Sequence, residues 1–407
     1  MDIKITPSKL CGSVNVPSSK SFAHRQIICA ALSDGKSVVS NVSVSQDIEA
    51  TVRAMNALGA DLTINGYTVT ANPFKGVADT NMPINIDCGE SGSTLRFIIP
   101  VAAALGVNAT FTGRGKLPVR PLTPYVTELS KSGIDFGGYN GTLPMTISGK
   151  LRSGRFEIAG DISSQFITGL IFGLSLTDGR SEIILTSRLQ SKPYVDITVE
   201  SLKMFGVQVK ETANGYEISG GQGFKACNCA VEGDFSQAAF FYAANALGSS
   251  IEMPNMPKHS VQGDSVIRNV CGNRTAFELD CSDVPDIVPI MSVFASALKG
   301  TTSFKNVGRL RIKESDRIET TIGLLKSLGG NAWCDNDTLF VEGVGKLRGG
   351  TVDSHNDHRI AMSAAIAATI CNGDVIIKDA GCVKKSYPSF FEDYNELGGN
   401  ANVINLE

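Results

Sequence analysis

The sequence lacks a long apolar run of the kind that crosses a membrane as a helix. Its longest apolar stretches, at 97–107 and 360–370, are about half as long as a bilayer requires. The first ten residues, MDIKITPSKL, contain neither a basic segment nor an apolar core, so no signal peptide is expected.

A large excess of either charge is also missing, because 37 Lys and Arg stand against 40 Asp and Glu. This balance argues against nucleic acid as the main partner, since proteins that bind a phosphate backbone are usually basic over a whole face.

Residues that hold metal ions are scarce or poorly spaced. The chain has four His, and its ten Cys form no CxxC pair; CNC at 227–229 is the closest spacing. Zinc sites require such clusters, so we expect no metal ion. Buried free thiols in a reducing compartment explain the Cys content, and this interpretation predicts a cytoplasmic location.

An amphipathic helix followed by alternating strands recurs along the chain. A Gly after the last helical residue stops each helix, and NGY and DNDT have the composition of hairpin turns. The copies occupy 52–71, 126–149, 198–220, 321–343 and, truncated, 390–407, with a worn copy at 266–282. Their spacing, roughly 55 to 75 residues, is too long for a solenoid. The pattern predicts a compact α/β subdomain that is used about six times.

Six further helices are predicted to be buried. They are apolar nearly all round, as helices inside a protein are, so the amphipathic helices would cover the outside. The six segments are 19–32, 93–105, 164–176, 236–247, 286–298 and 358–370.

RIKESDR, residues 311–317, has five ionisable side chains in seven positions. Ile318, Ile322 and Leu325 follow at helical spacing, which places these charges on the first turn of a predicted helix. Lys313 and Arg317 would then share one face at the helix start, an arrangement that the helix dipole and like-charge repulsion disfavour. A bound anion would compensate for it.

The predicted buried helices begin with hydroxyl groups and cations. PSSKS, CGESGSTLR, GDISSQF and NDHR open four of them, and KKSYP precedes a helix near the C-terminus. Ordinary N-capping explains the serines. Repeated cations at helix starts instead indicate bound anions. We therefore expect a small ligand that carries phosphate and carboxylate groups and is held by converging helix starts.

Three other features have two interpretations each. Arg114, Lys116 and Arg120 in GRGKLPVRP form either part of the site or a solvated basic loop. Asp286, at the head of an apolar helix, is a cap or a general base. Glu314 is an acid–base partner or an ordinary first-turn carboxylate.

The motifs PSSKSFAHR, GESGSTLRF, VRP, GDISSQF, SKPYVDIT, VPD, RIKESDR, NDHR and KKSYP together resemble those of 5-enolpyruvylshikimate-3-phosphate synthases, in order from about residue 7 to 390. The resemblance implies transfer of the enolpyruvyl group of phosphoenolpyruvate to the 5-hydroxyl of shikimate 3-phosphate by addition and elimination, in the pathway to chorismate and aromatic amino acids. It implies no cofactor. The implied fold is a two-domain, inside-out α/β barrel of about six βαβαββ repeats, three per domain. We expect domains at 1–17 with 232–407 and at 18–231, an active site in the cleft between them, and a monomer.

The resemblance also implies roles for individual residues. Catalysis would rest on Asp286 as general base, with Glu314 and Lys20 as candidate proton donors to the methylene carbon and the departing phosphate. Phosphoenolpyruvate would be bound by Lys20, Gly92, Arg120, Gln165, Arg317, Arg359 and Lys385, with its carboxylate on Arg317 and Arg359. Shikimate 3-phosphate would be bound by Lys20, Ser21, Arg25, Ser163, Ser164, Gln165, Ser191, Tyr194, Asp286, Arg309 and Lys313.

The chain departs from the family pattern at two positions. Glu90 places a carboxylate next to Gly92, where it would repel a phosphate unless it is paired or turned away, and Arg309 stands where the family often has Asn. A rival enzyme of the same fold is UDP-N-acetylglucosamine 1-carboxyvinyltransferase, which usually has a Cys where this chain has Gly115. From another class, a non-catalytic anion-binding or nucleic-acid-binding protein would also have basic helix starts, but it would not need Asp286 and Glu314 beside them.

Overall fold

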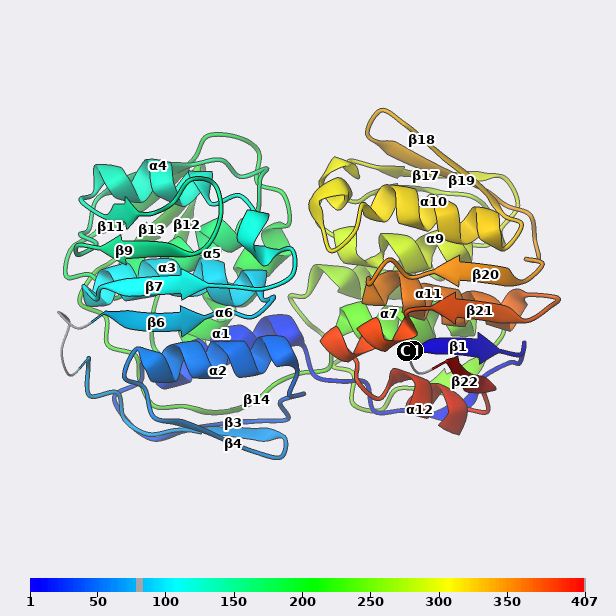
Figure 1. Cartoon of the computed structure of the whole chain (residues 1–407), viewed down its shortest axis with the longest axis horizontal. Helices are drawn as coiled ribbons and strands as arrows, with labels where there is room; N and C mark the ends of the chain where they lie inside the picture. Colours follow the sequence, from blue (N-terminus) through cyan, green and yellow to red (C-terminus); the bar gives the residue numbers. More distant parts are fainter. Residues whose placement is uncertain (78–82, 406–407) are drawn as a thin grey trace. The chain divides into compact units, whose positions relative to one another are not determined.

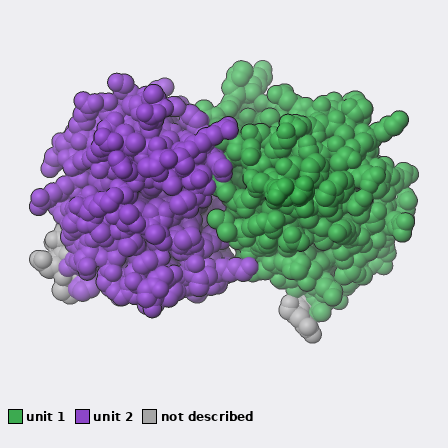
Figure 2. Space-filling view, turned by 90° about the horizontal axis from the view of Figure 1, so that it is seen from above, with its two compact units in different colours: residues 1–17, 233–407 green, residues 18–232 purple. Residues whose placement is uncertain are grey.

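The structure is a computed structural model that describes residues 1–77 and 83–405. It divides the chain into two compact units, which Figure 2 colours separately. Unit 1 combines Met1–Pro17 with Gly233–Glu407, and unit 2 is Ser18–Glu232. Each unit has its own hydrophobic core. None of the helices formed by the described residues is long and apolar enough to cross a membrane.

Unit 2 contains three four-stranded mixed sheets in its described part. In each sheet the first strand is parallel to the second, and the other neighbours are antiparallel. In order of pairing, the strands are β14 (Asn228–Ala230), β3 (Ser37–Ser40), β5 (Thr68–Ala71) and β4 (Leu62–Asn65); β6 (Ile84–Asp87), β7 (Ala109–Thr112), β9 (Met145–Ser148) and β8 (Asp135–Gly137); and β10 (Arg155–Ile158), β11 (Ser181–Leu185), β13 (Gly215–Ile218) and β12 (Val209–Thr212) (Figure 1).

Unit 1 repeats this design with one reduced sheet. Its described residues form two four-stranded sheets with the same mixture of directions and one parallel pair. In order of pairing, the strands are β20 (Gly350–Asp353), β21 (Val375–Lys378), β1 (Asp2–Ile5) and β22 (Ala401–Asn405); β16 (Glu278–Asp280), β17 (Thr301–Lys305), β19 (Thr338–Glu342) and β18 (Asn331–Asp335); and β15 (Ser250–Glu252) with β2 (Cys11–Ser13).

The six predicted buried helices are present, and nearly all of their residues are buried. They are α1 (Lys20–Ala31), α3 (Gly92–Leu105) and α5 (Ser164–Ser175) in unit 2, and α7 (Phe235–Ala246), α9 (Val288–Ser296) and α11 (His358–Ala367) in unit 1. The amphipathic helices are α2 (Gln46–Ala57), α4 (Thr123–Lys131), α6 (Lys192–Met204), α10 (Arg317–Ser327) and α12 (Phe390–Glu396). The architecture is therefore a mixed α/β fold built from repeated βαβαββ units.

Local rules account for the ends of these elements. The Gly that follows each amphipathic helix has a positive φ, between 79° and 91°, as a left-handed helix end requires; these residues are Gly59, Gly133, Gly206, Gly329 and Gly398. The predicted hairpin turns are confirmed, because Asn65 pairs with Thr68 and Asp335 pairs with Thr338. The worn copy at 266–282 is reduced further than predicted. Its helix α8 (Ile267–Val270) has four residues, and its strand β16 belongs to the next sheet.

Helices α3 and α5 approach closely at Gly173 of α5 and Pro100 of α3. Gly173 on α5 has no side chain, and a Cβ there would lie 2.6 Å from the carbonyl oxygen of Pro100 on α3. Pro100 itself cannot donate to the carbonyl of Arg96 one turn earlier. The hydroxyl of Tyr125, on α4, donates to that oxygen instead at 2.7 Å. The packing of α3 therefore fixes the backbone that carries Arg96.

Candidate active site

The first turns of α1, α3 and α5 are capped by the serines that the sequence indicated. The Oγ of Ser19 accepts from the backbone N–H of Phe22, and the Oγ of Ser163 accepts from that of Gln165 at 3.3 Å. Ser91 caps α3 in the same way, accepting from Thr94 N at 3.1 Å. Because the serine hydroxyls accept from these backbone N–H groups, the cations and amides of the first turns are not needed as caps.

Gly92 lies at the start of α3 among two guanidinium groups and one amide. A Cβ on Gly92 would lie 2.8 Å from Nη1 of Arg120, 3.5 Å from Nη1 of Arg96 and 3.6 Å from Oε1 of Gln165. Arg96 donates to Oε1 of Gln165 at 2.6 Å, while Nε2 of Gln165 donates to Ser93 Oγ at 3.0 Å. Within the residues that the structure describes, neither arginine has a carboxylate within 4.0 Å. This cluster is arranged to receive an anion.

Arg96 was not predicted as a site residue, although it stands in the quoted motif CGESGSTLR. It is buried, and burial followed by the charge of Arg120 lowers the pKa of its guanidinium to about 10. Its guanidinium carbon lies 4.9 Å from the ring centre of Phe166. Its place near the start of a helix could be read from the motif, but only the packing of α3 against α5 brings it to Gln165.

Glu90 and the loop 113–121 explain how a carboxylate is tolerated next to Gly92. The carboxyl carbon of Glu90 lies 2.7 Å from the place that a Cβ on Gly115 would occupy, so this side chain rests on the loop. Arg114 pairs with Asp87 at 3.2 Å. Of the cations predicted in this loop, Arg120 is the one that the structure places beside Gly92.

Arg25 joins α1 to α5 and α6 in a second cluster, in which it is the cation and hydroxyl and backbone oxygens accept its hydrogen bonds. It is fully buried, and burial lowers the pKa of its guanidinium to about 9. It donates to Oγ1 of Thr198 at 2.7 Å, to the backbone oxygen of Tyr194 at 2.8 Å and to that of Ser21 at 2.7 Å. The predicted residues Ser21, Arg25 and Tyr194 are therefore brought together. Thr198 was not predicted, since a threonine inside a helix carries no signal in the sequence.

Two further predicted segments of unit 2 have the expected local structure. Ser191 precedes α6 with a left-handed backbone, φ 58°, and is buried. Lys20, the first residue of α1, forms an ion pair with Asp47 at 3.0 Å. Lys192 instead forms an ion pair with Asp196, one turn later on α6, at 2.7 Å. Ser191 and Lys20 are held in place by the fold, whereas Lys192 is engaged with carboxylates of the surface.

In unit 1, the prediction that RIKESDR forms a first helical turn is wrong. Helix α10 begins at Arg317, because the carboxylate of Asp316 accepts from the backbone N–H groups of Ile318 and Glu319 at 3.1 and 3.3 Å. The preceding residues form a 3₁₀ turn, Gly308–Ile312, and Lys313 is extended. Lys313 and Arg317 are therefore not one helical turn apart.

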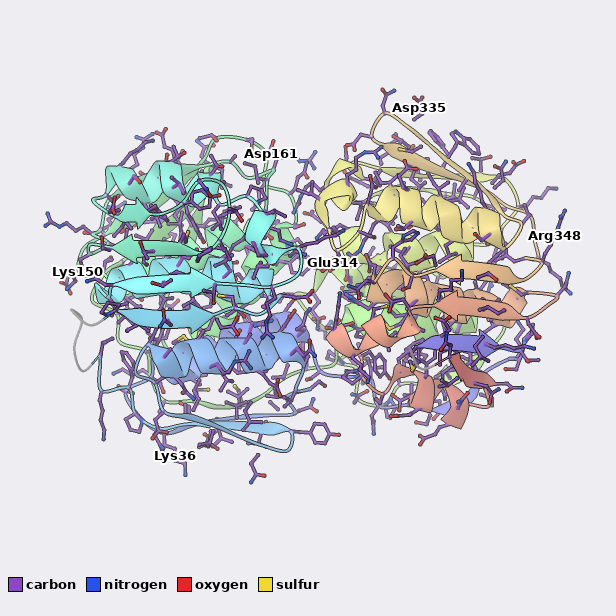
Figure 3. All side chains as sticks on the ribbon, in the orientation of Figure 1. Lys36, Lys150, Asp161, Glu314, Asp335 and Arg348 are labelled. Atoms are coloured by element: carbon purple, nitrogen blue, oxygen red, sulfur yellow. The ribbon has the colours of Figure 1, made fainter. Side chains whose placement is uncertain are left out.

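Arg317 is compensated by carboxylates of its own unit. It is 1% exposed, and its guanidinium contacts Asp357 at 2.8 Å, Asp286 at 2.8 Å and Glu314 at 2.6 Å. Although burial works against its charge, Asp357, Glu314 and Asp286 raise the pKa of Arg317 well above its usual value. Figure 3 labels Glu314 on the segment that precedes α10. The sequence missed Asp357, which is 40 residues away along the chain.

Asp286 is the centre of this group of charges. It lies in the 3₁₀ turn Pro285–Ile287 that leads directly into α9. Besides Arg317, its carboxylate contacts Arg359 at 3.4 Å and Lys313 at 3.7 Å. Burial is the largest influence on Lys313 and lowers its pKa, which the charge of Asp286 opposes.

The start of α11 supplies Arg359. Asp357 caps this helix by accepting from the backbone N–H of Arg359 at 2.9 Å. The side chain of Arg359 donates to the backbone oxygen of Ser236 at 2.9 Å. Burial, followed by the charge of Arg359, lowers the pKa of the neighbouring His358 to about 3, so this imidazole is neutral. The Nζ of Lys385 donates to the backbone oxygen of Asn356 at 3.0 Å, which places it beside the same helix start.

Within unit 1, the structure thus brings together Asp286, Lys313, Glu314, Arg317 and Arg359. In unit 2 it brings together Gly92, Arg120 and Gln165, and separately Ser21, Arg25 and Tyr194. Among the described residues, no group of three or more His, Cys, Asp or Glu is arranged to hold a metal ion.

Comparison with known proteins shows which family this chain resembles. Residues 5–394 match the family described as EPSP synthase (3-phosphoshikimate 1-carboxyvinyltransferase). A 3-phosphoshikimate 1-carboxyvinyltransferase of Clostridium perfringens is 44% identical, covering 97% of this chain and 98% of the relative. That of Clostridioides difficile strain 630 is 43% identical, covering 99% of both. The solved structure of EPSP synthase from Acinetobacter baumannii shares the fold with a TM-score of 0.85 at 24% identity, covering 99% of this chain and 100% of that one.

Proposed function

Because the chain belongs to the EPSP synthase family and has 3-phosphoshikimate 1-carboxyvinyltransferase activity in the shikimate pathway, we propose that the clusters described above hold its two substrates. Those substrates are phosphoenolpyruvate and shikimate 3-phosphate. The observation that carries the proposal is the position of Asp286, whose carboxylate contacts Arg317, Arg359 and Lys313 together.

The phosphate of phosphoenolpyruvate is held in unit 2 by the cluster at Gly92. Arg120 and Gln165 lie beside the Gly92 backbone, and a side chain at this position would fill the space that the anion needs. Arg96 orients Gln165 through its 2.6 Å hydrogen bond. Lys20 and Lys385 complete the predicted set.

The carboxylate of phosphoenolpyruvate is held in unit 1 by Arg317 and Arg359. Planar guanidinium groups suit this task because they can donate two parallel hydrogen bonds. Both groups contact Asp286, and Arg317 also contacts Glu314. The incoming carboxylate therefore replaces part of these contacts. Its binding releases Asp286 and Glu314 for proton transfer.

Shikimate 3-phosphate is held by the cluster around Arg25 in unit 2 and by Lys313. Its phosphate binds at the helix starts that carry Ser163, Ser164 and Gln165. Its ring lies against Tyr194, near Arg25. The remaining proposed ligands are Lys20, Ser21, Ser191, Asp286 and Arg309.

The reaction then proceeds by proton transfers between these groups. Asp286 removes the proton from the 5-hydroxyl, whose oxygen attacks C2 of phosphoenolpyruvate, while Glu314 or Lys20 supplies a proton to the methylene carbon. This addition gives a tetrahedral intermediate. Loss of a proton from the new methyl group and departure of inorganic phosphate then restore the double bond as an enol ether.

The Asp286→Asn variant tests the role of Asp286. Asparagine keeps the shape and one acceptor for Arg317, but it cannot take up a proton. We expect kcat for phosphate release to fall by about 100-fold or more, because a general base contributes that much, while the KM of phosphoenolpyruvate changes far less. Asp335, which Figure 3 labels, lies at the tip of the β18–β19 hairpin, and Asp335→Asn is the matched control. A variant with normal kcat would exclude Asp286 as the base.

Three further expectations accompany this proposal. The proposed ligands come from both units, so the active site requires the two units to enclose the substrates together. We further propose that the enzyme acts in the cytoplasm, as its ten free cysteines suit a reducing compartment. We also propose that it acts as a monomer, as the resemblance to the family implies.

A further inference from the structure

Asp264 is a buried carboxyl group outside the proposed set of substrate ligands. It lies in the 3₁₀ turn Gly263–Val266 and is 3% exposed. Its Oδ2 accepts a hydrogen bond from the hydroxyl of Ser236, but its Oδ1 is buried with no hydrogen-bond partner among the described residues. A buried carboxylate that is only half satisfied is costly to ionise.

Two contacts connect this carboxyl group to the centre of unit 1. Ser236 is the second residue of α7, and its backbone oxygen accepts from Nη1 of Arg359 at 2.9 Å. The other terminal nitrogen of Arg359, Nη2, lies 3.4 Å from Oδ2 of Asp286. Asp264 is thus linked to Arg359 through Ser236, and Arg359 in turn contacts Asp286.

The charged groups around Asp264 act in opposite directions. Burial is the largest influence, and together with Asp286 of the 285–287 turn and Asp234, the N-cap of α7, it raises the pKa of Asp264 to about 7. The hydroxyl of Ser236 and the charge of Arg359 on α11 work against this rise. Arg268 of α8 donates to two backbone carbonyls of the 257–258 segment and so is engaged elsewhere.

We propose that Asp264 is a positioning residue for the reaction, which acts through Ser236 and Arg359 to set how strongly the start of α11 attracts the carboxylate of phosphoenolpyruvate. This inference rests on the proposed role of Arg359.

The direction of the effect follows from charge. When Asp264 is protonated, Asp286 is the nearest carboxylate that Arg359 contacts, and the guanidinium attracts the substrate carboxylate strongly. When Asp264 ionises, a second negative charge offsets that of Arg359. The KM of phosphoenolpyruvate therefore rises as the pH increases through the range in which Asp264 loses its proton.

The test compares the pH dependence of KM and kcat in wild type, Asp264→Asn and Ser236→Ala between pH 5.5 and 9. The asparagine variant cannot ionise, so its KM should be lower than that of wild type by about fivefold at high pH and equal to it at low pH. Ser236→Ala removes a hydroxyl that favours the carboxylate, so the inflexion should move to higher pH. The second ionisation of the substrate phosphate, near pH 6, affects all three proteins alike and cancels in the ratio. Asp335→Asn is again the control for loss of a carboxyl group.

A second readout does not depend on activity. The carboxyl carbon of Asp264, assigned by its absence from the Asp264→Asn spectrum, should titrate near neutral pH in ¹³C NMR of the whole labelled protein. A titration near pH 4, or identical KM profiles for wild type and Asp264→Asn, would overturn the inference. Arg359→Lys separates this failure from that of the proposed function. If that variant leaves the KM of phosphoenolpyruvate unchanged, the proposed role of Arg359 is wrong; if it raises KM while Asp264→Asn has no effect, only the present inference is wrong.

Discussion

At the scale of single residues, the most informative feature is that Arg317 is surrounded by carboxylates of its own unit. Three of them lie within 2.8 Å of its guanidinium. Removing one partner of such a buried group is strongly destabilising, because it leaves a charge uncompensated. The proposed substrate carboxylate avoids this cost, since it brings a negative charge of its own when it displaces Asp286 or Glu314.

Arg120 permits a prediction about affinity. Its Nη1 lies beside Gly92, and it has no carboxylate partner within 4.0 Å among the described residues. We expect Arg120→Ala to raise the KM of phosphoenolpyruvate by at least about tenfold, because a charge-assisted hydrogen bond is lost, with a smaller effect on kcat. Arg120→Lys should recover only part of the affinity, since an ammonium group cannot donate two parallel bonds.

Steady-state kinetics of phosphate release at varied phosphoenolpyruvate would measure both changes. Arg114→Ala is the control from the same loop, because Arg114 is paired with the exposed Asp87. If the two alanine variants raised KM equally, the effect would come from the charge of the whole loop and not from the place of Arg120.

Residues with local signals could be predicted from the sequence. Ser19, Ser91 and Ser163 cap helices as expected, since a cap depends on contacts within a few residues. The partners of Arg317 could not be predicted in this way. Asp286 and Asp357 are 31 and 40 residues distant, and only the packing of α9, α10 and α11 brings them together.

At the scale of elements, the start of α10 shows why the first helical turn was placed wrongly. Periodicity of Ile318, Ile322 and Leu325 indicates that a helix exists, but it does not fix its first residue. Asp316 fixes it, because its carboxylate accepts from two backbone N–H groups. The consequence is that Arg317 becomes the first helical residue and points into the core.

The cap can be tested by stability. Asp316→Ala should lower the free energy of unfolding of unit 1 by about 1 kcal/mol, the usual value for loss of an N-cap. Asp316→Asn should cost less than half of that, because asparagine caps as well as aspartate. Urea denaturation of both variants measures the difference. Equal losses would instead implicate the ion pair between Asp316 and Arg311.

At the scale of the whole molecule, the repeats were readable in the sequence because each one ends in a helix, a Gly and a hairpin. The order of strands within each sheet was not readable, since strand pairing joins distant segments. The sheet of β3, β4 and β5 takes its fourth strand, β14, from about 190 residues later.

The proposed enclosure of substrates by the two units gives a prediction for solution scattering. The Asp286→Asn variant is suitable because slow turnover keeps both substrates bound. Its radius of gyration should decrease when phosphoenolpyruvate and shikimate 3-phosphate are added together, as domain closure around ligands requires. An unchanged scattering profile at saturating substrate would contradict enclosure.

The pairing of β1 with both β21 and β22 has a consequence for protein synthesis. Asp2 pairs with Asn405, so β1 can pair fully only after residues 375–405 have left the ribosome. Unit 2, by contrast, has all of its strands once residue 232 has emerged. Translation at about 5–20 residues per second thus lets unit 2 fold first, while residues 1–17 wait for the rest of unit 1. A nascent chain stalled before β21 would carry a folded, protease-resistant middle and an unpaired N-terminal strand.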